Sequence, residues 1–203
     1  MLERKKGTDI VTELGGIKNV DAAMALFGKK MDAEQLSRIK KIKNPEVLTK
    51  IANAVAMCDP DKCFVFTGSD ADKDFVRNLA LEQGEEKTLP MKDHTIHYDL
   101  KDEQGRIVDR TFYIINEGEA TSSLGKKMLR ADAMKDVKEK MGGVMKGRTM
   151  IIGFFNRGPI GSPAANPALE ITSSAYVMHS AFILYRVAVS YTHLTLPTTR
   201  QRC

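Results

Sequence analysis

The chain has 203 residues, of which 42% are hydrophobic and 28% charged, a composition that fits one globular domain of ordinary size with a single core. No apolar run approaches the roughly 20 residues of a membrane-spanning helix, and no apolar stretch follows the basic N-terminus as in a secretory signal, so we expect a cytoplasmic protein that contacts no membrane. The formal net charge of +5 suggests a nucleic-acid-binding protein. Most basic residues stand beside acidic ones, however, and this pattern is more typical of solvated helix faces.

Three helices are predicted before residue 58. Each follows a side chain that can accept a hydrogen bond from the free N–H groups of a first helical turn. The predicted ranges are 22–27 after Asn19 and ended by Gly28, 33–42 after Asp32, and 46–57 after Asn44 and Pro45.

Strands and helices then alternate. Strands are predicted at 63–66, 94–98, 106–115, 150–155 and 169–172, and helices at 70–82, 122–141 and 175–184. Residues 67–69 form a turn, Gly142 and Gly143 end the second of these helices, Asn156 and Arg157 break the strand before them, and Ser174 caps the last helix. This order indicates an α/β fold with a mixed sheet flanked by helices.

Two motifs suggest nucleotide or calcium binding, and both lack required residues. Gly125-Lys126-Lys127 resembles the end of a phosphate-binding P-loop, but no glycine stands five positions before Gly125 and no hydroxyl follows Lys126, so we interpret it as a helix N-terminus with exposed lysines. Asp70, Asp72 and Asp74 alternate as in a calcium loop without its turn glycine, and they fit carboxylates at the positive end of a helix.

Cysteine and histidine spacings do not indicate a metal site. Cys58 and Cys63 have no second cysteine pair, and His94 and His97 are spaced to point to opposite faces of a strand. We therefore expect no metal ligands in this chain.

The amino-acid composition of the last residues differs from that of the rest of the chain. Residues 187–203 contain four threonines and no acidic residue, and back-translation of 189–198 can read through a transposon-derived sequencing adapter. We therefore expect native sequence to end near Arg186 and 187–203 to be a non-native tail. Without Arg200 and Arg202, the net charge falls from +5 to +3.

The stretch from Met145 to Arg186 has the most specific pattern in the chain. A basic lead, MKGRTM, precedes an apolar strand, and the loop GPIGSP and the run EITSSAYV follow. In this order they resemble the N-terminal domain of GTP-dependent phosphoenolpyruvate carboxykinases. The matching residues are Gly147, Arg148, Thr149, Gly158, Pro159, Gly161, Ser162, Pro163, Thr172, Ser174, Tyr176 and Val177. Asn156-Arg157 stands where the family has Ser-Met, which suggests a distant branch.

The resemblance implies a substrate-binding residue. The family has a segment Ala-Arg-Ile-Glu-Ser-Lys-Thr whose arginine binds the carboxylate of phosphoenolpyruvate or oxaloacetate, and GRIVDRT places Arg106 there, with Arg110 as the alternative. The residue type suits this role, because a planar guanidinium can hold a carboxylate through two parallel hydrogen bonds.

The resemblance also implies an activity and a domain arrangement. Residues 1–186 would be a carboxykinase N-terminal, substrate-binding domain, truncated before the nucleotide-binding domain. The whole enzyme would convert oxaloacetate and GTP to phosphoenolpyruvate, CO2 and GDP, using Mn2+ or Mg2+. Since the family binds GTP and metal in its C-terminal domain, we expect no catalytic, cofactor or metal residue here and an inactive fragment.

Two other functions remain open from the sequence. A stand-alone α/β module for a carboxylate or phosphate would require 187–203 to be genuine. A basic nucleic-acid-binding protein would bind duplexes with a strong dependence on salt.

Overall fold

The computed structural model describes residues 10–99, 111–121, 125–159, 162 and 164–187. The helices of this part are α1 (Ile10–Gly15), α2 (Val20–Lys30), α3 (Ala33–Ile39), α4 (Pro45–Cys58), α5 (Asp70–Glu82), α6 (Arg130–Met141) and α7 (Ala175–Leu184). The strands are β1 (Lys62–Phe66), β2 (Lys87–Thr88), β3 (Thr95–Ile96), β4 (Phe112–Ile115), β5 (Lys126–Leu129), β6 (Thr149–Arg157), β7 (Asn166–Thr172) and β8 (Arg186–Val187).

The main sheet is mixed, as the sequence predicts. Strand β6 lies in its centre, parallel to β1 on one side and antiparallel to β7 on the other. The short strand β8 also pairs with β6 in the antiparallel sense, at Phe155 and Asn156. Strands β2 and β3 form a separate antiparallel pair, and β4 and β5 a separate parallel pair.

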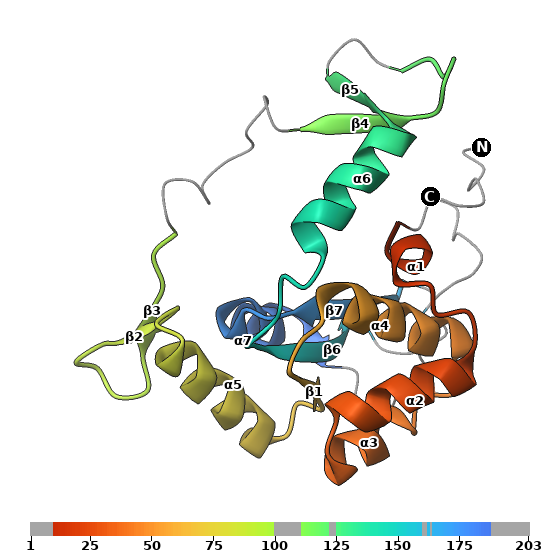
Figure 1. The fold of residues 1–203 in the computed structure, drawn as a ribbon. Coiled ribbons are helices and arrows are strands. Elements are labelled where there is room, and N and C mark those ends of the chain that lie inside the picture. Colours follow the sequence, from red (N-terminus) through yellow and green to blue (C-terminus); the bar gives the residue numbers. More distant parts are fainter. Residues whose placement is uncertain (1–9, 100–110, 122–124, 160–161, 163, 188–203) are drawn as a thin grey trace.

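Helices cover both faces of the main sheet. Alternate residues of β6 point to opposite sides, so Met150, Ile152 and Phe154 join one buried cluster with α2 and α4. Ile151 and Phe155 join a second cluster with α5 and α7. The result is a three-layer arrangement, which we call the layered lobe: the main sheet with α1–α5 and α7 (Figure 1).

Helix α3 covers the free edge of β1. The amide N of Val65 donates to Gln35 Oε1 at 2.7 Å, and its carbonyl accepts from Arg38 Nη1 at 2.7 Å. Side chains thus satisfy backbone groups that another strand would otherwise pair with, which protects the edge against association. Arg38 also holds Asp72 of α5 at 3.0 Å, and this carboxylate accepts from the amide N of Thr67 at 2.7 Å.

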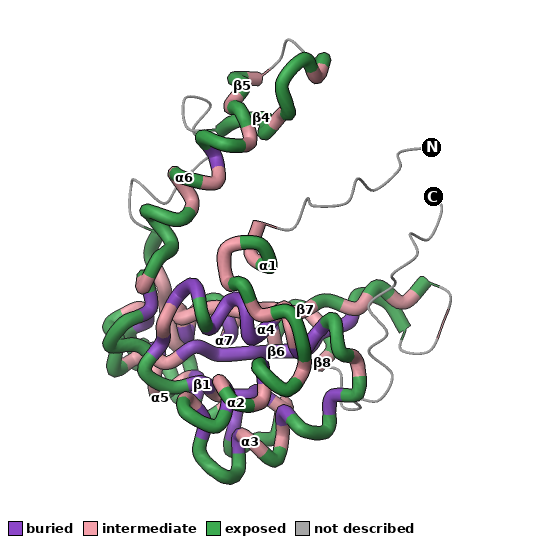
Figure 2. The backbone as a smooth tube through the Cα atoms, turned by 45° about the vertical axis from the view of Figure 1, so that its right-hand side comes forward, coloured by how far each residue is buried: buried purple, intermediate pink, exposed green. Residues whose placement is uncertain are grey.

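Strands β4 and β5 and helix α6 lie apart from the lobe, and we call them the arm. Figure 1 shows α6 rising from the layered part with β4 and β5 at its far end, and Figure 2 shows little buried backbone there. The contacts to the lobe include an ion pair between Arg130 and Glu13, with 2.5 Å between Nη2 and Oε2. At the other end of α6, the amide N of Gly143 donates to Met57 O at 2.9 Å.

Several predicted elements are confirmed. Helix α5 has the predicted range 70–82, and Asn19, Asp32, Asn44 and Ser174 accept hydrogen bonds at the N-termini of their helices. The predicted strands at 63–66 and 169–172 are present as parts of β1 and β7.

Other boundaries were predicted wrongly. Helix α2 continues through Gly28 to Lys30, and the chain becomes extended only at Met31. Phe27, next to Gly28, is fully buried, and its packing anchors this end of the helix. Helix α3 ends at Ile39 and not at residue 42, and β3 comprises only Thr95 and Ile96 of the predicted 94–98.

The predicted break at Asn156 and Arg157 is absent. Strand β6 continues through both residues because they pair with Pro167 and Asn166 of β7. Hydrogen bonds to a neighbouring strand outweigh the local preference of these residues for a loop.

The predicted helix 122–141 begins only at Arg130. Lys126–Leu129 is the strand β5, which pairs in parallel with β4, so the interpretation of Gly125-Lys126-Lys127 as a helix N-terminus was wrong. Gly125 faces the ring of Tyr113, and a Cβ there would lie 2.3 Å from Tyr113 Cε2. Pairing with β4 therefore overrides helix propensity in this segment.

Candidate functional site

The residues predicted to bind substrate, Arg106 and Arg110, lie outside the described part of the chain. The structure does describe the residues before and after segment 100–110. His97 and Asp99 follow β3 on one side, and Thr111 leads into β4 on the other. The candidate site is therefore defined by the groups that hold the N-terminal flank of this segment.

His97 fastens that flank to the lobe. Its Nδ1 lies 2.6 Å from the carbonyl O of Glu85, and its Nε2 lies 3.1 Å from Asp99 Oδ1. The ring stacks on Tyr176 of α7 with 3.5 Å between centroids and 12° between planes. A carbonyl and a carboxylate can only accept, so both hydrogen bonds form together only when the imidazole carries a proton on each nitrogen.

Glu85 joins the same flank to the N-terminus of α7. Its Oε2 accepts from Ser174 Oγ at 3.0 Å and from the amide N of Tyr176 at 2.9 Å. Ser174 Oγ in turn accepts from the amide N of Val177 at 3.2 Å, as an N-cap residue should. A carboxylate here also meets the positive end of the helix dipole.

Glu86 makes a second contact to α7. Its Oε1 lies 2.6 Å from Nδ1 of His179, and the carboxylate is buried. Because a carboxylate oxygen accepts, His179 Nδ1 is the donor in this bond. Glu85 and Glu86 thus hold the start of the β2–β3 pair against α7 through neighbouring side chains.

The motif residues of the resemblance have structural roles around this junction. Thr172 Oγ1 accepts from the amide N of Ser174 at 3.0 Å, and the ring of Tyr176 stacks on that of His97.

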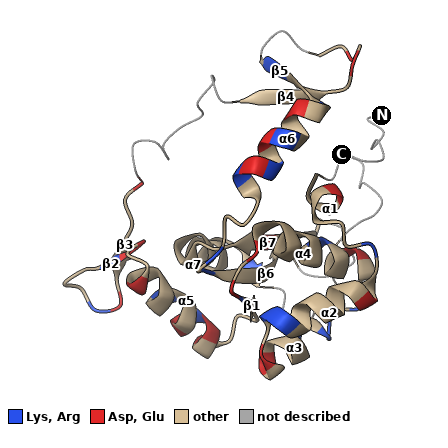
Figure 3. Ribbon diagram, in the orientation of Figure 1, with Lys and Arg blue, Asp and Glu red and all other residues tan. Residues whose placement is uncertain are grey.

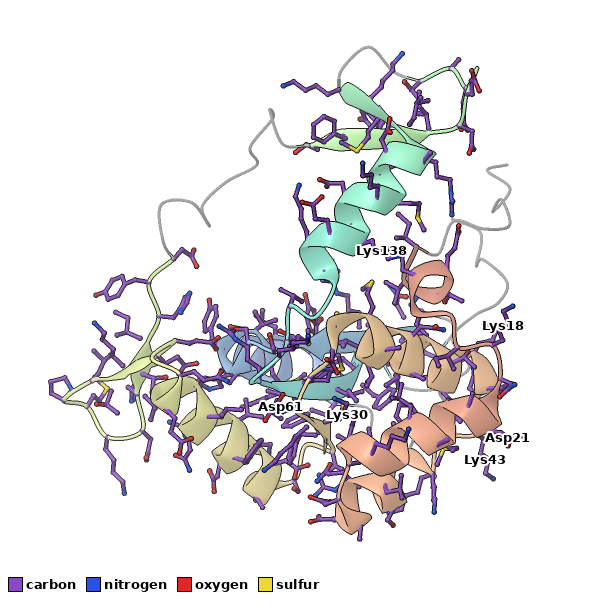
Figure 4. The ribbon with its side chains drawn as sticks, in the orientation of Figure 1. Lys18, Asp21, Lys30, Lys43, Asp61 and Lys138 are labelled. Carbon is purple, nitrogen blue, oxygen red and sulfur yellow. The ribbon has the colours of Figure 1, made fainter. Side chains whose placement is uncertain are left out.

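Another motif residue, Gly147, has φ of +76°, which favours glycine, and its amide N donates to Asp61 Oδ1 at 3.0 Å. Asp61 is labelled in Figure 4 at the start of β1. Part of the loop 158–163, which belongs to the motif, lies outside the described residues.

Most of this junction has no recognisable signal in the sequence. Glu85 and Tyr176 are 91 residues apart, and nothing in the local pattern around Glu85, Glu86 or His97 marks them as partners of α7. Only the EITSSAYV motif, which supplies Ser174 and Tyr176, points to the place where they meet.

Asp72 has a larger role than the sequence suggested. It lies in the first turn of α5, as predicted, and it is also buried and holds Arg38, with Thr67 Oγ1 donating to its Oδ2 at 2.5 Å.

Among the described residues, no group of three or more His, Cys, Asp or Glu side chains is arranged to hold a metal ion. Cys58 and Cys63 are both buried and free, and burial raises the pKa of the Cys63 thiol to about 12. A thiol with that pKa carries almost no thiolate at neutral pH and is a poor nucleophile.

A cleft of about 520 Å³ opens between α5, the β2–β3 pair and α7. Its basic side chains already have partners: Lys73 pairs with Asp70 at 2.9 Å, and Arg77 Nη2 donates to the carbonyl O of Asp93 at 2.8 Å. The charges of both signs offset one another, so we assign no anionic ligand to this cleft.

Basic and acidic side chains are mixed over the described surface. Figure 3 shows both signs along α6 and across α2, α3 and α5. Lys30, labelled in Figure 4, pairs with Asp59 at 2.8 Å, and Lys140 of α6 pairs with Asp136 at 2.7 Å. No helix in the described part of the chain is both long and apolar enough to cross a membrane.

Comparison with known proteins matches the resemblance seen in the sequence. Residues 50–200 match the family model of the phosphoenolpyruvate carboxykinase N-terminal domain. Phosphoenolpyruvate carboxykinase [GTP] of Pyrococcus furiosus is 38% identical over 167 residues, which cover 82% of this chain and 27% of the relative. The enzyme of the same name from Thermococcus sibiricus is 39% identical over 158 residues, or 78% of this chain and 25% of the relative.

A more distant relative is the cytosolic phosphoenolpyruvate carboxykinase [GTP] of Gallus gallus, 29% identical over 155 residues that cover 72% of this chain and 25% of the relative. The chain thus spans about a quarter of the length of these curated relatives. The family predicted from the motifs is confirmed: the chain belongs to the phosphoenolpyruvate carboxykinases, and it corresponds to their N-terminal domain.

Proposed function

We propose that the chain is the substrate-carboxylate-binding part of a GTP-dependent phosphoenolpyruvate carboxykinase. The observation that carries this proposal is the 38% identity over 82% of the chain to a relative named for that activity. The complete enzyme would convert oxaloacetate and GTP to phosphoenolpyruvate, CO2 and GDP.

The proposed reaction has two bond exchanges. The bond between the departing carboxylate and its neighbouring carbon breaks and CO2 leaves. The electron pair of that bond forms a carbon–carbon double bond, and the π electrons of the carbonyl group move to its oxygen, which gives an enolate. That oxygen then forms a bond to the γ-phosphorus of GTP, and GDP leaves with the electrons of the broken phosphoanhydride bond.

Within this chain the proposed role is to hold the substrate. Arg106, with Arg110 as the alternative, would bind a carboxylate of oxaloacetate or phosphoenolpyruvate through parallel hydrogen bonds. The contacts of His97 and Glu85 with α7 support this role, because they fasten the chain just before the arginine segment. A fixed flank reduces the entropy lost when the arginine binds its ligand.

GTP and Mn2+ or Mg2+ would be held by residues outside this chain. We therefore propose that the 203-residue chain alone catalyses no turnover.

We also propose that residues 187–203 are a non-native tail. The match to the family model extends into this segment as far as residue 200.

The test is Arg106→Ala in the complete enzyme encoded at the source locus. Losing a charged hydrogen bond of about 1.5 to 3 kcal/mol should raise the Michaelis constant for oxaloacetate roughly 10-fold to 150-fold. The constant for GTP should change little, which serves as the internal control.

Arg110→Ala is the matched variant, since it removes the same charge four residues away. A large effect of Arg110→Ala with none of Arg106→Ala would transfer the role to Arg110. Unchanged Michaelis constants for oxaloacetate in both variants would remove this segment from the substrate site.

A further inference from the structure

The imidazole of His97 has a hydrogen-bond acceptor at each of its two nitrogens. The carbonyl O of Glu85 lies 2.6 Å from Nδ1, and Asp99 Oδ1 lies 3.1 Å from Nε2. A neutral imidazole has a single N–H, so if Nδ1 donates to the carbonyl, the lone pair of Nε2 faces the carboxylate. Only the imidazolium, with a proton on each nitrogen, makes both bonds at once.

The surroundings of the ring also suit a positive charge. The ring of Tyr176 lies 3.5 Å away, centroid to centroid, at an angle of 12°, and the π face of an aromatic ring attracts a cation. The side chain of His97 is 18% exposed and that of Asp99 is 54% exposed, so water screens their attraction only in part. The charge of the ring therefore controls how firmly Asp99 is held.

The β2–β3 pair and α7 bring four other ionisable side chains near this ring: Glu85, Glu86, Lys87 and His179. The two carboxylates are bonded to groups of α7, and the exposed Lys87 of β2 has Ile96 as its register partner. Asp99, by contrast, is bonded to the ring itself and directly precedes segment 100–110. It is therefore the group through which the charge of His97 acts on the chain that follows.

We propose that His97 is a positioning residue whose protonated ring holds the chain before the substrate arginine, so that the affinity for oxaloacetate falls as the pH rises. This rests on the proposed function, because Arg106 follows Asp99 by seven residues. Histidine side chains ordinarily change charge between about pH 5 and 8. Below that change both bonds of the ring form, and above it the bond to Asp99 and the fixed flank that favours binding are lost.

The first test is an NMR titration of the histidine ring nitrogens in the 203-residue chain. Asp99→Asn removes the charge at similar size, and its midpoint for His97 should be lower by about 0.5 pH unit. His94, whose Nδ1 lies 2.8 Å from the carbonyl O of Lys92, is the internal control and should keep its midpoint. An unchanged midpoint of His97 would overturn the proposal, because the carboxylate would then not favour the protonated ring.

The second test measures the Michaelis constant for oxaloacetate against pH in the complete protein encoded at the source locus. From about pH 6 to 8 the constant should rise about 3-fold, while kcat keeps its pH profile in all variants. In His97→Gln, which cannot titrate, the constant should stay at the high value throughout. Asp99→Asn should stay at the low value, because its amide can accept from Nε2 or donate to it.

His94→Gln is the matched control, since it removes a histidine three residues earlier, and it should keep the pH dependence of the unsubstituted enzyme. Equal pH profiles for the unsubstituted enzyme and His97→Gln would overturn the proposal.

The arginine variants keep this idea distinct from the proposed function. A lowered His97 midpoint in Asp99→Asn, with unchanged Michaelis constants in Arg106→Ala and Arg110→Ala, would contradict only the proposed substrate arginine. A raised constant in an arginine variant, with no effect of His97→Gln on the pH profile, would contradict only the role of His97.

Discussion

The layered lobe and the arm use similar side chains with opposite results. Phe154 of β6 is 1% exposed between sheet and helices, whereas Phe112 of β4 is 40% exposed. Phe154 lies in the main mixed sheet, where β6 has a strand on each side and helices on both faces. Phe112 lies in a sheet of two strands, β4 and β5. The difference shows that apolar content alone does not determine burial, because a strand also needs layers to cover it.

The lobe also satisfies the backbone groups at the edge of β1 with its own side chains. Gln35 and Arg38 pair with the backbone of Val65 there, while the strands of the arm have no such cover among the described residues. The edge of β1 is thus covered within the lobe, whereas most of β4 in the arm is exposed. The following substitutions test that contrast.

The largest expected effect is on the free energy of unfolding when Phe154 is replaced by alanine. Phe154→Ala should reduce it by about 4 kcal/mol, because the substitution removes a buried ring and leaves a cavity. Phe112→Ala is the matched control in the arm and should cost less than about 1 kcal/mol, since the ring is already partly in water. Urea unfolding of the 203-residue chain measures both, and similar losses would show that the arm is as well packed as the lobe.

The next effect concerns the buried pair that links α3 and α5. Asp72→Ala removes the acceptor of the Thr67 amide and the buried carboxylate partner of Arg38, which should cost about 3 kcal/mol. Asp70→Ala, in the same helical turn but with a side chain 96% exposed, should change stability by less than about 0.5 kcal/mol. Equal midpoints for the two variants in urea would contradict a structural role for Asp72.

The smallest effect concerns the ion pair between the arm and α1. The hydrogen bond from Arg130 lowers the pKa of Glu13. At pH values above the unfolded-state pKa of this carboxyl group, the ion pair therefore stabilises the contact between α6 and α1. That contribution is lost as pH falls through the lowered, folded-state pKa. Hydrogen exchange of the α6 amides, corrected for the pH dependence of the intrinsic exchange rate, should therefore become slightly faster as the pH falls.

Glu13→Gln provides the control for this pH effect, because it removes the titrating group at similar size. In the variant the corrected exchange of α6 should no longer change over that pH range. A response identical to that of the unsubstituted chain would assign the effect to another group.

Sequence patterns predicted the lobe well and the arm poorly, for physical reasons. Helix α5 was predicted with its observed bounds from the turn at residues 67–69, which is a local signal, and in the structure Ser69 of that turn accepts from the amide N of Asp72. Strand β5 was missed because Lys126–Leu129 has no local preference strong enough to reveal its pairing with β4. Such pairing depends on residues that are distant in the sequence.

The candidate site shows the same limit. The motif from Thr172 to Val177 identified the family and supplied Ser174 and Tyr176, but its partners Glu85 and His97 come from a part of the chain with no recognisable motif. The substrate arginine, Arg106, was predicted from resemblance alone and lies outside the described residues, so its role stays a prediction.

If this chain is one part of a carboxykinase, turnover should require the complete protein. Formation of phosphoenolpyruvate from oxaloacetate and GTP is measured with the complete protein of the source locus and with the 203-residue chain at equal concentration. We expect product that depends on both substrates from the complete protein and none from the chain alone. No product from a folded complete protein, or turnover by the isolated chain, would contradict it.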